Sequence, residues 1–258
     1  MKKENPTLTI ITVCFNIKNE IERTCKSIVN QTWQDFEWIV VDGGSTDGTV
    51  DILKKYTDRI NILISEPDKG IYNAMNKGIK LAHGKWLNFM NGGDCLAYDD
   101  VLEKVFKYTH YSSILQGKEE RYSHKNKLDH IFSLDVQIDK FFFLRTSLAH
   151  QSMFFQKKLF DIYGLYDENY QYCADTEKNL QLISSGVSVE LLPFVVSRFW
   201  LTGISQNNKS LQKRRYEHNK FNKKYFSLEE LNRFINSNKY TTIYKLFNFI
   251  PFLTIENI

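Results

Sequence analysis

Apolar and polar positions follow two different periods along the first hundred residues. Short, mainly apolar runs indicate strands, and a wholly apolar run such as 38–41 is typical of a strand buried on both faces. They are separated by stretches in which apolar residues recur every three to four positions, as in helices. The runs predict strands at 8–13, 38–41, 60–64 and 86–90, and the periodic stretches predict helices at 20–29, 49–56 and 71–81. Strands that alternate with helices indicate βαβ units and a parallel sheet with right-handed crossovers.

The pattern loosens after residue 94. It predicts helices at 99–108, 157–163 and 176–185, and strands at 113–116, 152–156, 187–192 and 195–200, the last two separated by Pro193. The segment 117–129 is polar and has no clear period, so we predict a mobile loop there. From Ser205 onward the chain is predicted to be helical, and it is rich in basic and aromatic residues.

Composition limits what the chain can be. With 258 residues, 42% of them hydrophobic, it is one large domain, or a domain with an appendage, and it can bury a sizeable core. The net charge of +4 requires no polyanionic partner. The basic surplus is uneven, however, because residues 209–224 hold seven Lys or Arg and one acid, Glu217.

Cysteine spacing and hydropathy indicate in which cellular compartment the protein is expected. The four cysteines lie far apart without a CxxC pair, which favours reduced thiols in the cytosol over a disulfide framework or a zinc site. The N-terminus lacks the apolar length of a signal peptide. No run approaches the ~20 apolar residues that a membrane span needs.

Two of the buried runs end in polar turns that contain a carboxylate. Asp42 and the turn Gly43-Gly44-Ser45 follow the run 38–41, and Asn91-Gly92-Gly93-Asp94 follows the run 86–90. In an open α/β sheet, ligands bind beyond the carboxyl ends of the strands. Both turns are therefore candidate binding sites, although an isolated Asp in such a place more often serves only its own turn.

Two further features suit an anionic ligand and a cation. Gly70 precedes the predicted helix 71–81, and the free N–H groups at a helix start suit an anion. Hard cations take oxygen ligands, so Asp94 together with diphosphate oxygens and water is a chemically adequate Mg²⁺ or Mn²⁺ site.

Taken together, these segments resemble the family 2 glycosyltransferases. The resemblance covers about residues 7–200 and rests on the segments 12–16, 41–49, 68–84 and 91–94. It looks closest to the branch that assembles bacterial exopolysaccharide, capsule or O-antigen. It implies an α/β fold of the GT-A type: a Rossmann-like nucleotide-sugar-binding domain with a mixed central sheet at 1–204. A basic, aromatic, helical C-terminal extension would follow at 205–258.

The resemblance also implies a donor site for a nucleotide sugar with uracil as the expected base. Its expected members are Thr12, Phe15 and Asn16 at the nucleotide, Asp42 as the acceptor of a hydrogen bond from uracil, and Asp68, Asn76 and Asn91 along the ribose and diphosphate.

A divalent metal, Mn²⁺ or Mg²⁺, is implied as the cofactor, with Asp94 as the metal-binding member of a DxD-type motif. The chain departs from that motif. Asn91 stands where an Asp is usual, and Gly93 stands where another Asp is common. We therefore expect weak or atypical metal use.

Asp175 occupies the position of the family's catalytic base, just before the predicted helix 176–185. An inverting transfer needs such a group, because a carboxylate within ~3 Å of the acceptor hydroxyl can take its proton. The alternative is that Asp175 caps this helix, and the two roles can coexist. His150 and Gln151 are weaker candidates for acceptor contacts, with a purely structural role as their alternative. Glu177 and His150 remain as substitute bases.

The sequence thus predicts a cytoplasmic inverting glycosyltransferase, a hexosyl- or N-acetylhexosaminyl-transferase. The donor is a nucleotide sugar, UDP-linked, and the acceptor is a glycan or a lipid-linked glycan in surface polysaccharide assembly. The alternative function is a catalytically silent sugar-nucleotide-binding protein. A nicotinamide oxidoreductase is disfavoured because the segment 43–48 does not fit GxGxxG.

The C-terminal extension has two interpretations. A basic, aromatic, amphipathic segment can lie on an anionic membrane, here the inner face of the plasma membrane. The other interpretation is an appendage that packs on the core or on a second subunit of a homodimer. We expect no nucleic-acid partner, because no basic stripe accompanies a recognisable nucleic-acid-binding module.

Overall fold

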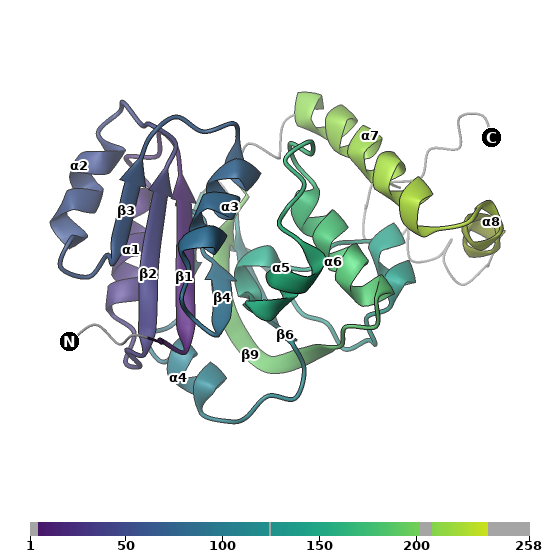
Figure 1. The fold of residues 1–258 in the computed structure, drawn as a ribbon, viewed down its shortest axis with the longest axis horizontal. Coiled ribbons are helices and arrows are strands. Elements are labelled where there is room, and N and C mark those ends of the chain that lie inside the picture. Colours follow the sequence, from purple (N-terminus) through teal and green to yellow (C-terminus); the bar gives the residue numbers. More distant parts are fainter. Residues whose placement is uncertain (1–4, 124, 202–207, 237–258) are drawn as a thin grey trace.

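The computed structural model describes residues 5–123, 125–201 and 208–236. Within them, the centre of the protein is a nine-stranded mixed sheet with helices on both faces (Figure 1). The strand order is β3-β2-β1-β4-β8-β6-β9-β5, and β7 pairs with β6. The strands are β1 Leu8–Cys14, β2 Phe36–Asp42, β3 Ile62–Ser65, β4 Trp86–Phe89, β5 Cys95–Leu96, β6 Ile114–Tyr122, β7 Leu128–Phe132, β8 Met153–Gln156 and β9 Val189–Trp200.

The α-helices follow the predicted pattern closely in the first half of the chain. They are α1 Ile21–Val29, α2 Thr49–Leu53, α3 Ile71–Leu81, α4 Val101–Phe106, α5 Lys158–Tyr163, α6 Ala174–Ser184, α7 Asn208–Tyr225 and α8 Leu228–Asn236. Short 3₁₀ turns lie at Lys54–Tyr56, Lys140–Leu144 and His150–Ser152.

The parallel half of the sheet is built as the sequence predicts. β1 pairs in parallel with both β2 and β4, and β2 pairs in parallel with β3. The carboxyl ends of these strands therefore meet at one edge of the sheet. The other half is mixed, because β8 runs antiparallel to both β4 and β6, whereas β6 and β9 are parallel.

Each face of the sheet carries its own helical layer and its own core. Along β1, Leu8 and Ile10 pack in the core that contains α1, α2 and α4, whereas Ile11 and Val13 pack in the core that contains α3, α5 and α6. Burial on both faces explains why apolar side chains occur on both sides of the strand. Helix α3 lies so close to β1 that a Cβ at Gly78 would be 2.5 Å from the Cγ2 of Ile11.

The predicted mobile loop at 117–129 is wrong. Residues 117–122 continue β6, and β7 begins at Leu128 and pairs with β6. The polar side chains of β6 have partners in the sheet: the Nε of Arg121 lies 2.9 Å from Glu119, and the Nε of Arg198 on β9 lies 2.8 Å from Glu120. Because these charged side chains pair within the sheet instead of facing water, the sequence of this strand does not alternate between apolar and polar residues.

The two strands predicted on either side of Pro193 are one strand, β9. Its pairing with β6 shifts between Gln116 and Lys118, which lie opposite Leu191 and Val195. Pro193 falls inside this shift. A register irregularity accommodates a residue without an N–H, because no ladder hydrogen bond is required there.

The described part of the extension packs on the main core. Helix α7 contacts α6, and Phe221 of α7 is fully buried in the same core as α3 and α6. Helix α8 adds Leu231 and Phe234 to that core. Tyr240, Tyr244, Phe247 and Phe249, which belong to the predicted aromatic region, lie outside the described residues. None of the helices in the described ranges has the length and apolar character required to cross a bilayer.

This packing predicts that α7 folds together with the sheet. Phe221→Ala should lower stability by about 3–5 kcal/mol, the usual range for emptying a buried aromatic site. Chemical denaturation should show a single transition at lower denaturant concentration. Tyr216→Ala on the same helix is the matched control, since Tyr216 is 69% exposed. Equal stability of the two variants would show that α7 is a separate appendage.

Candidate active site

One large cavity opens at the edge where the parallel strands end. Its volume is about 1670 Å³. Pockets for one small ligand typically measure ~300–1,000 Å³, so this one has room for two substrates. Its wall is formed by the ends of β1 and β9, the turn after β4, the start of α3, the segments 146–151 and 168–173, the start of α6, and α7.

Most of the predicted site residues meet in this cavity. Its lining includes Phe15, Asn16, Asp68, Asn91, Asp94, His150, Gln151 and Asp175. These residues come from segments spread over more than 150 positions of the chain, and the sheet brings them together. Thr12, Asp42 and Asn76 do not line the cavity.

The side chains of Thr12 and Asn76 are buried and form hydrogen bonds within the protein. The hydroxyl of Thr12 is fully buried and accepts a hydrogen bond from the indole N–H of Trp38, 3.0 Å away. The amide of Asn76 bonds to both the backbone N–H and the carbonyl of Tyr166, and it also donates to Glu168. Asn76 therefore fastens α3 to the segment that leads toward α6.

Asp42 organises its own turn. Its carboxylate has no exposed surface. It accepts hydrogen bonds from the backbone N–H groups of Gly44 and Ser45 and from the hydroxyls of Ser45 and Ser65. Gly44 has a φ of +83°, which a glycine adopts without strain. For Asp42 to accept a bond from a ligand, one of these bonds would have to open.

Phe15 and Asp68 lie close to Gly43. A Cβ at Gly43 would lie 2.6 Å from the Oδ2 of Asp68 and 3.3 Å from the ring of Phe15, so a larger residue would displace the Asp68 carboxylate. The ring of Phe15 lines the cavity and is 57% exposed. Asn16 has a φ of +49°, and its side chain accepts a hydrogen bond from the N–H of Thr46. An open aromatic face beside polar groups suits a flat, polar ring such as a nucleobase.

The turn 91–94 is fixed by two consecutive residues of α1. The hydroxyl of Thr24 accepts a bond from the N–H of Gly93 and donates to the carbonyl of Asp94. The Nε of Arg23 donates to the carbonyl of Gly93. These contacts hold the backbone on both sides of Asp94, so its carboxylate has a defined place in the cavity wall.

Asp94 and Asn91 are suited to a cation. Asp94 is buried, and burial raises the pKa of its carboxyl to about 8, so it keeps its proton unless a positive charge is bound beside it. Gln151 donates to its Oδ2 over 2.8 Å. The Oδ1 of Asn91 is buried and has no hydrogen-bond partner. A divalent cation would use both oxygen atoms.

Protein residues alone do not complete a metal site. Among the residues described, no group of three or more His, Cys, Asp or Glu could hold a metal ion. A cation beside Asp94 would therefore take its remaining ligands from a bound substrate and from water.

Arg23 is a site residue that the sequence did not indicate. Its guanidinium lies 3.8 Å from the ring centroid of Trp200 on β9, and the residue lines the cavity next to the turn 91–94. A stacked, anchored guanidinium is a preorganised partner for phosphate groups. In the sequence it is only an Arg on an amphipathic helix, where a solvated side chain is the ordinary expectation.

Asp175 lies in the first turn of α6, which begins at Ala174, one residue before Asp175 and two before the predicted start. The N-cap residue is Cys173, so the interpretation of Asp175 as the N-cap is wrong. Its Oδ1 accepts a hydrogen bond of 2.9 Å from the hydroxyl of Tyr72 on α3. Burial raises the pKa of Tyr72 well above its usual range, so the phenol remains a donor. Asp175 is thus held in place within the cavity wall.

His150 and Glu177 differ in their freedom to act. His150 is buried, stacks on Phe89 with 5.3 Å between ring centroids, and has no hydrogen-bond partner on either ring nitrogen. Burial lowers its pKa, which favours the neutral ring. Glu177 does not line the cavity, because its carboxylate accepts bonds from Lys224 and Tyr225 on α7.

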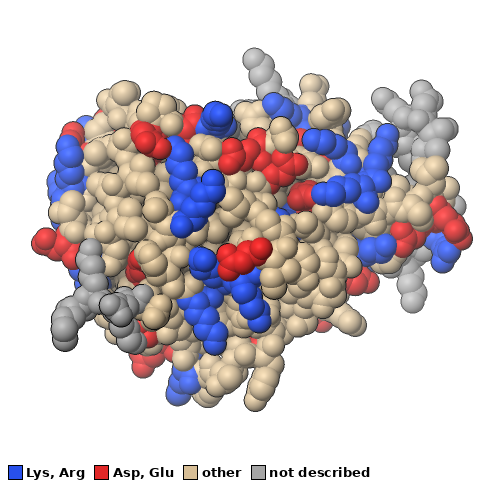
Figure 2. Space-filling view, viewed as in Figure 1, with Lys and Arg blue, Asp and Glu red and all other residues tan. Residues whose placement is uncertain are grey.

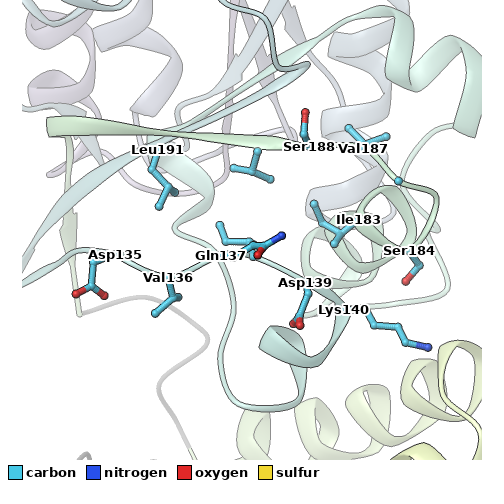
Figure 3. A pocket seen from close by; sticks show the side chains of 13 residues that line it. Asp135, Val136, Gln137, Asp139, Lys140, Ile183, Ser184, Val187, Ser188 and Leu191 are labelled. Carbon is cyan, nitrogen blue, oxygen red and sulfur yellow. The ribbon is translucent and has the colours of Figure 1, made fainter.

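A second cavity, of about 710 Å³, lies between the segment 135–140 and the connection from α6 to β9 (Figure 3). None of the predicted site residues lines it. Two of its three charged members are already engaged, because Asp139 caps a 3₁₀ turn and Lys140 donates to Glu230. It therefore offers less chemistry than the cavity at the strand ends.

Comparison with known proteins points to one family. The sequence model of the family described as "Glycosyl transferase family 2" matches residues 9–156. A "PGL/p-HBAD biosynthesis glycosyltransferase" of Mycobacterium bovis (strain BCG / Pasteur 1173P2) is 30% identical over 209 residues, which are 79% of this chain and 77% of that protein.

Solved structures share the fold. S. aureus TarS 1-349 in complex with UDP-GlcNAc superposes with a TM-score of 0.65 at 16% identity, covering 81% of this chain and 64% of that one. The mannosyltransferase PcManGT from Pyrobaculum calidifontis, in complex with GDP-Man and Mn²⁺, superposes with a TM-score of 0.61 at 17% identity. That match covers 82% of this chain and 61% of the other. At this level of identity the likeness concerns the fold alone.

Proposed function

The chain belongs to glycosyl transferase family 2 and is a glycosyltransferase with the GT-A fold, and we propose that it works by inversion on a UDP-sugar donor. The acceptor we propose is a glycan or a lipid-linked glycan in surface polysaccharide assembly. The observation that carries the proposal is the meeting of Asp175, held by Tyr72, and the turn 91–94 in one cavity.

We propose that the donor nucleotide binds at the ends of β1 and β2. Its base would lie against the exposed ring of Phe15, and Asn16 and Asp68 line the same cavity. Asp42 would act through the turn that it organises. The diphosphate would extend toward the turn 91–94, where Arg23 supplies a fixed positive charge, and toward the start of α3, where Gly70 and Ile71 line the cavity.

Asp94 is proposed to hold a divalent metal, Mn²⁺ or Mg²⁺, with Asn91 as a weaker, neutral oxygen ligand. Such a cation would neutralise charge on the leaving diphosphate. Gln151 contacts Asp94 directly, so we assign it to orienting this carboxylate and not to the acceptor. The mannosyltransferase that shares the fold was solved with Mn²⁺, which supports a divalent metal in general terms.

Asp175 is proposed as the general base. Its carboxylate would take the proton of the acceptor hydroxyl as the oxygen attacks the anomeric carbon from the side opposite the nucleotide. Tyr72 holds one carboxylate oxygen, so the other is available for this proton. His150 lines the same cavity, its buried ring nitrogens have no hydrogen-bond partner among the described residues, and it is proposed to contact the acceptor.

Asp175→Asn tests the base directly. Asparagine keeps the size of the side chain but cannot take the proton, so kcat for sugar transfer should fall by roughly 10²–10⁴-fold. Donor affinity and melting temperature should stay close to wild type, because Asp175 is not the N-cap of α6. Transfer from a panel of labelled nucleotide sugars supplies the assay.

Two results of that assay would count against the proposal. Wild-type turnover by the Asp175→Asn variant would remove Asp175 as the base. Tight UDP binding without transfer from any donor, even in wild type, would favour the silent nucleotide-binding protein.

Asp94→Ala tests the metal. This variant should lose the part of UDP binding that depends on Mn²⁺, whereas Asn91→Ala should lose much less, since a neutral amide binds a hard cation more weakly than a carboxylate does. Isothermal titration of UDP with and without Mn²⁺ measures both. If a chelator leaves wild-type binding and turnover intact, the metal assignment is wrong.

Helix α7 is proposed to bring the enzyme to a lipid-linked acceptor at an anionic membrane. Lys and Arg gather over α7, at the upper right of the view in Figure 2. Lys213, Arg214 and Arg215 line the cavity, while Lys220 and Lys223 lie on the exposed side of the helix. Removal of the whole segment after Ser205 would also empty the core site of Phe221, so surface substitutions give the cleaner test.

Lys220→Ala/Lys223→Ala should weaken binding to anionic vesicles at low salt by about 1 kcal/mol per Lys. The difference from wild type should shrink at high salt, where screening already weakens the attraction. Vesicle sedimentation measures both. Lys54→Ala/Lys55→Ala is the control, because these residues follow α2 at the other end of the molecule (Figure 1). Unchanged vesicle binding of the α7 variant would leave α7 with a packing role.

A further inference from the structure

Glu217 of α7 makes contacts that the reaction as described does not use. It is the single acid among the seven basic residues at 209–224. Its side chain is buried and faces the segment that leads into α6. The carboxylate accepts three backbone N–H bonds, from Gln171 at 2.8 Å, from Tyr172 at 2.9 Å and from Cys173 at 3.0 Å.

These three N–H groups precede the first turn of α6. Cys173 is the N-cap residue and makes no side-chain capping bond. A negative charge near the start of a helix is favourable, because the free N–H groups there carry partial positive charge. Glu217 thus supplies from another helix the carboxylate that the capping position of α6 lacks.

A second residue of α7 strengthens the same contact. The Nζ of Lys213 donates to the side-chain oxygen of Gln171 at 2.5 Å. Segment 171–173 is therefore held by α7 at its backbone and at one side chain. Asp175 follows two residues later, and its carboxylate accepts a hydrogen bond from Tyr72 on α3.

We propose that Glu217 is a positioning residue for the transfer reaction. By fixing the backbone at 171–173 it sets the place and direction of the Asp175 carboxylate in the cavity. This inference rests on the proposed role of Asp175 as the base. It makes α7 a working part of the active site, in addition to any contact that α7 makes with an acceptor or a membrane.

A matched control separates positioning from general stability. Glu177 is a second buried carboxylate that joins α6 to α7, and it accepts bonds from Lys224 at 2.8 Å and Tyr225 at 2.6 Å. Glu177 does not line the cavity, and its carboxylate makes no hydrogen bond to the segment 171–173 among the described residues. Its backbone N–H donates to the carbonyl of Cys173 at 2.9 Å, and a side-chain substitution leaves that bond in place. Glu177→Gln therefore weakens the same helix pair without releasing the segment before Asp175.

The experiment compares Glu217→Gln with Glu177→Gln in the full chain. In Glu217→Gln the amide NH₂ faces backbone donors, so amide hydrogen exchange at 171–173 should accelerate by about tenfold or more while distant core amides keep their protection. Displacement of a reacting group by about 1 Å can cost 10²-fold, so kcat should fall between tenfold and 10²-fold, with the donor KM within about twofold of wild type. Glu177→Gln should lower the melting temperature with kcat within about twofold of wild type.

Glu217→Asp keeps the charge but withdraws the carboxylate by one methylene. It should give intermediate exchange rates and an intermediate kcat, and it serves if Glu217→Gln does not fold. Unchanged exchange at 171–173, or an equal loss of kcat in the Glu177→Gln and Glu217→Gln variants, would overturn the inference. If the Asp175→Asn variant has normal turnover, the assignment of Asp175 as the base fails. Faster amide exchange in Glu217→Gln would still show that Glu217 holds the backbone of the segment 171–173.

Discussion

Backbone pairing around β1 is the constraint on which the site depends. β1 pairs in parallel with β2 and β4, and the ladder continues past the strands into their turns. Gly43 N–H donates to the carbonyl of Cys14, and Gly92 N–H donates to the carbonyl of Val13. Both turns are therefore fixed to one strand by main-chain bonds, which no side-chain substitution removes directly. The backbone at this edge of the cavity is therefore held in place even when the side chains that it carries are substituted.

Polar side chains in the cavity wall are positioned by other side chains. Gln151 holds Asp94, Tyr72 holds Asp175, and Trp200 carries the guanidinium of Arg23. Buried polar groups are costly unless they are bonded, so the unbonded Oδ1 of Asn91 and the unbonded ring nitrogens of His150 contrast with these pairs. Preorganisation of this kind matters for transfer chemistry, because charge and proton must move between groups that do not need to rearrange.

The sequence predicts the family, the GT-A fold and most of the cavity, and the exceptions have physical causes. A strand buried on both faces has no alternation, so nothing in the sequence shows that Thr12 turns into the core. The second part of strand β6 is not predicted because its residues are polar. Glu119 and Glu120 form ion pairs with Arg121 and Arg198, and Arg198 lies on the neighbouring strand β9, far away in the sequence. A polar residue in the sequence is ordinarily taken as a sign of solvent exposure, but Glu119 and Glu120 are polar and buried.

The charges of helix α7 are a second case in which the sequence does not show which polar side chains are buried. Composition reveals a basic segment with one acid, but it does not tell which charges face water, the cavity or the backbone. The fold turns the cations Lys213, Arg214 and Arg215 toward the cavity and turns Glu217 toward the N–H groups before α6. The exceptional charge in the segment is thus the buried one. A buried carboxylate surrounded by N–H donors fixes geometry, whereas exposed cations mainly attract, so one helix combines a structural and an electrostatic task.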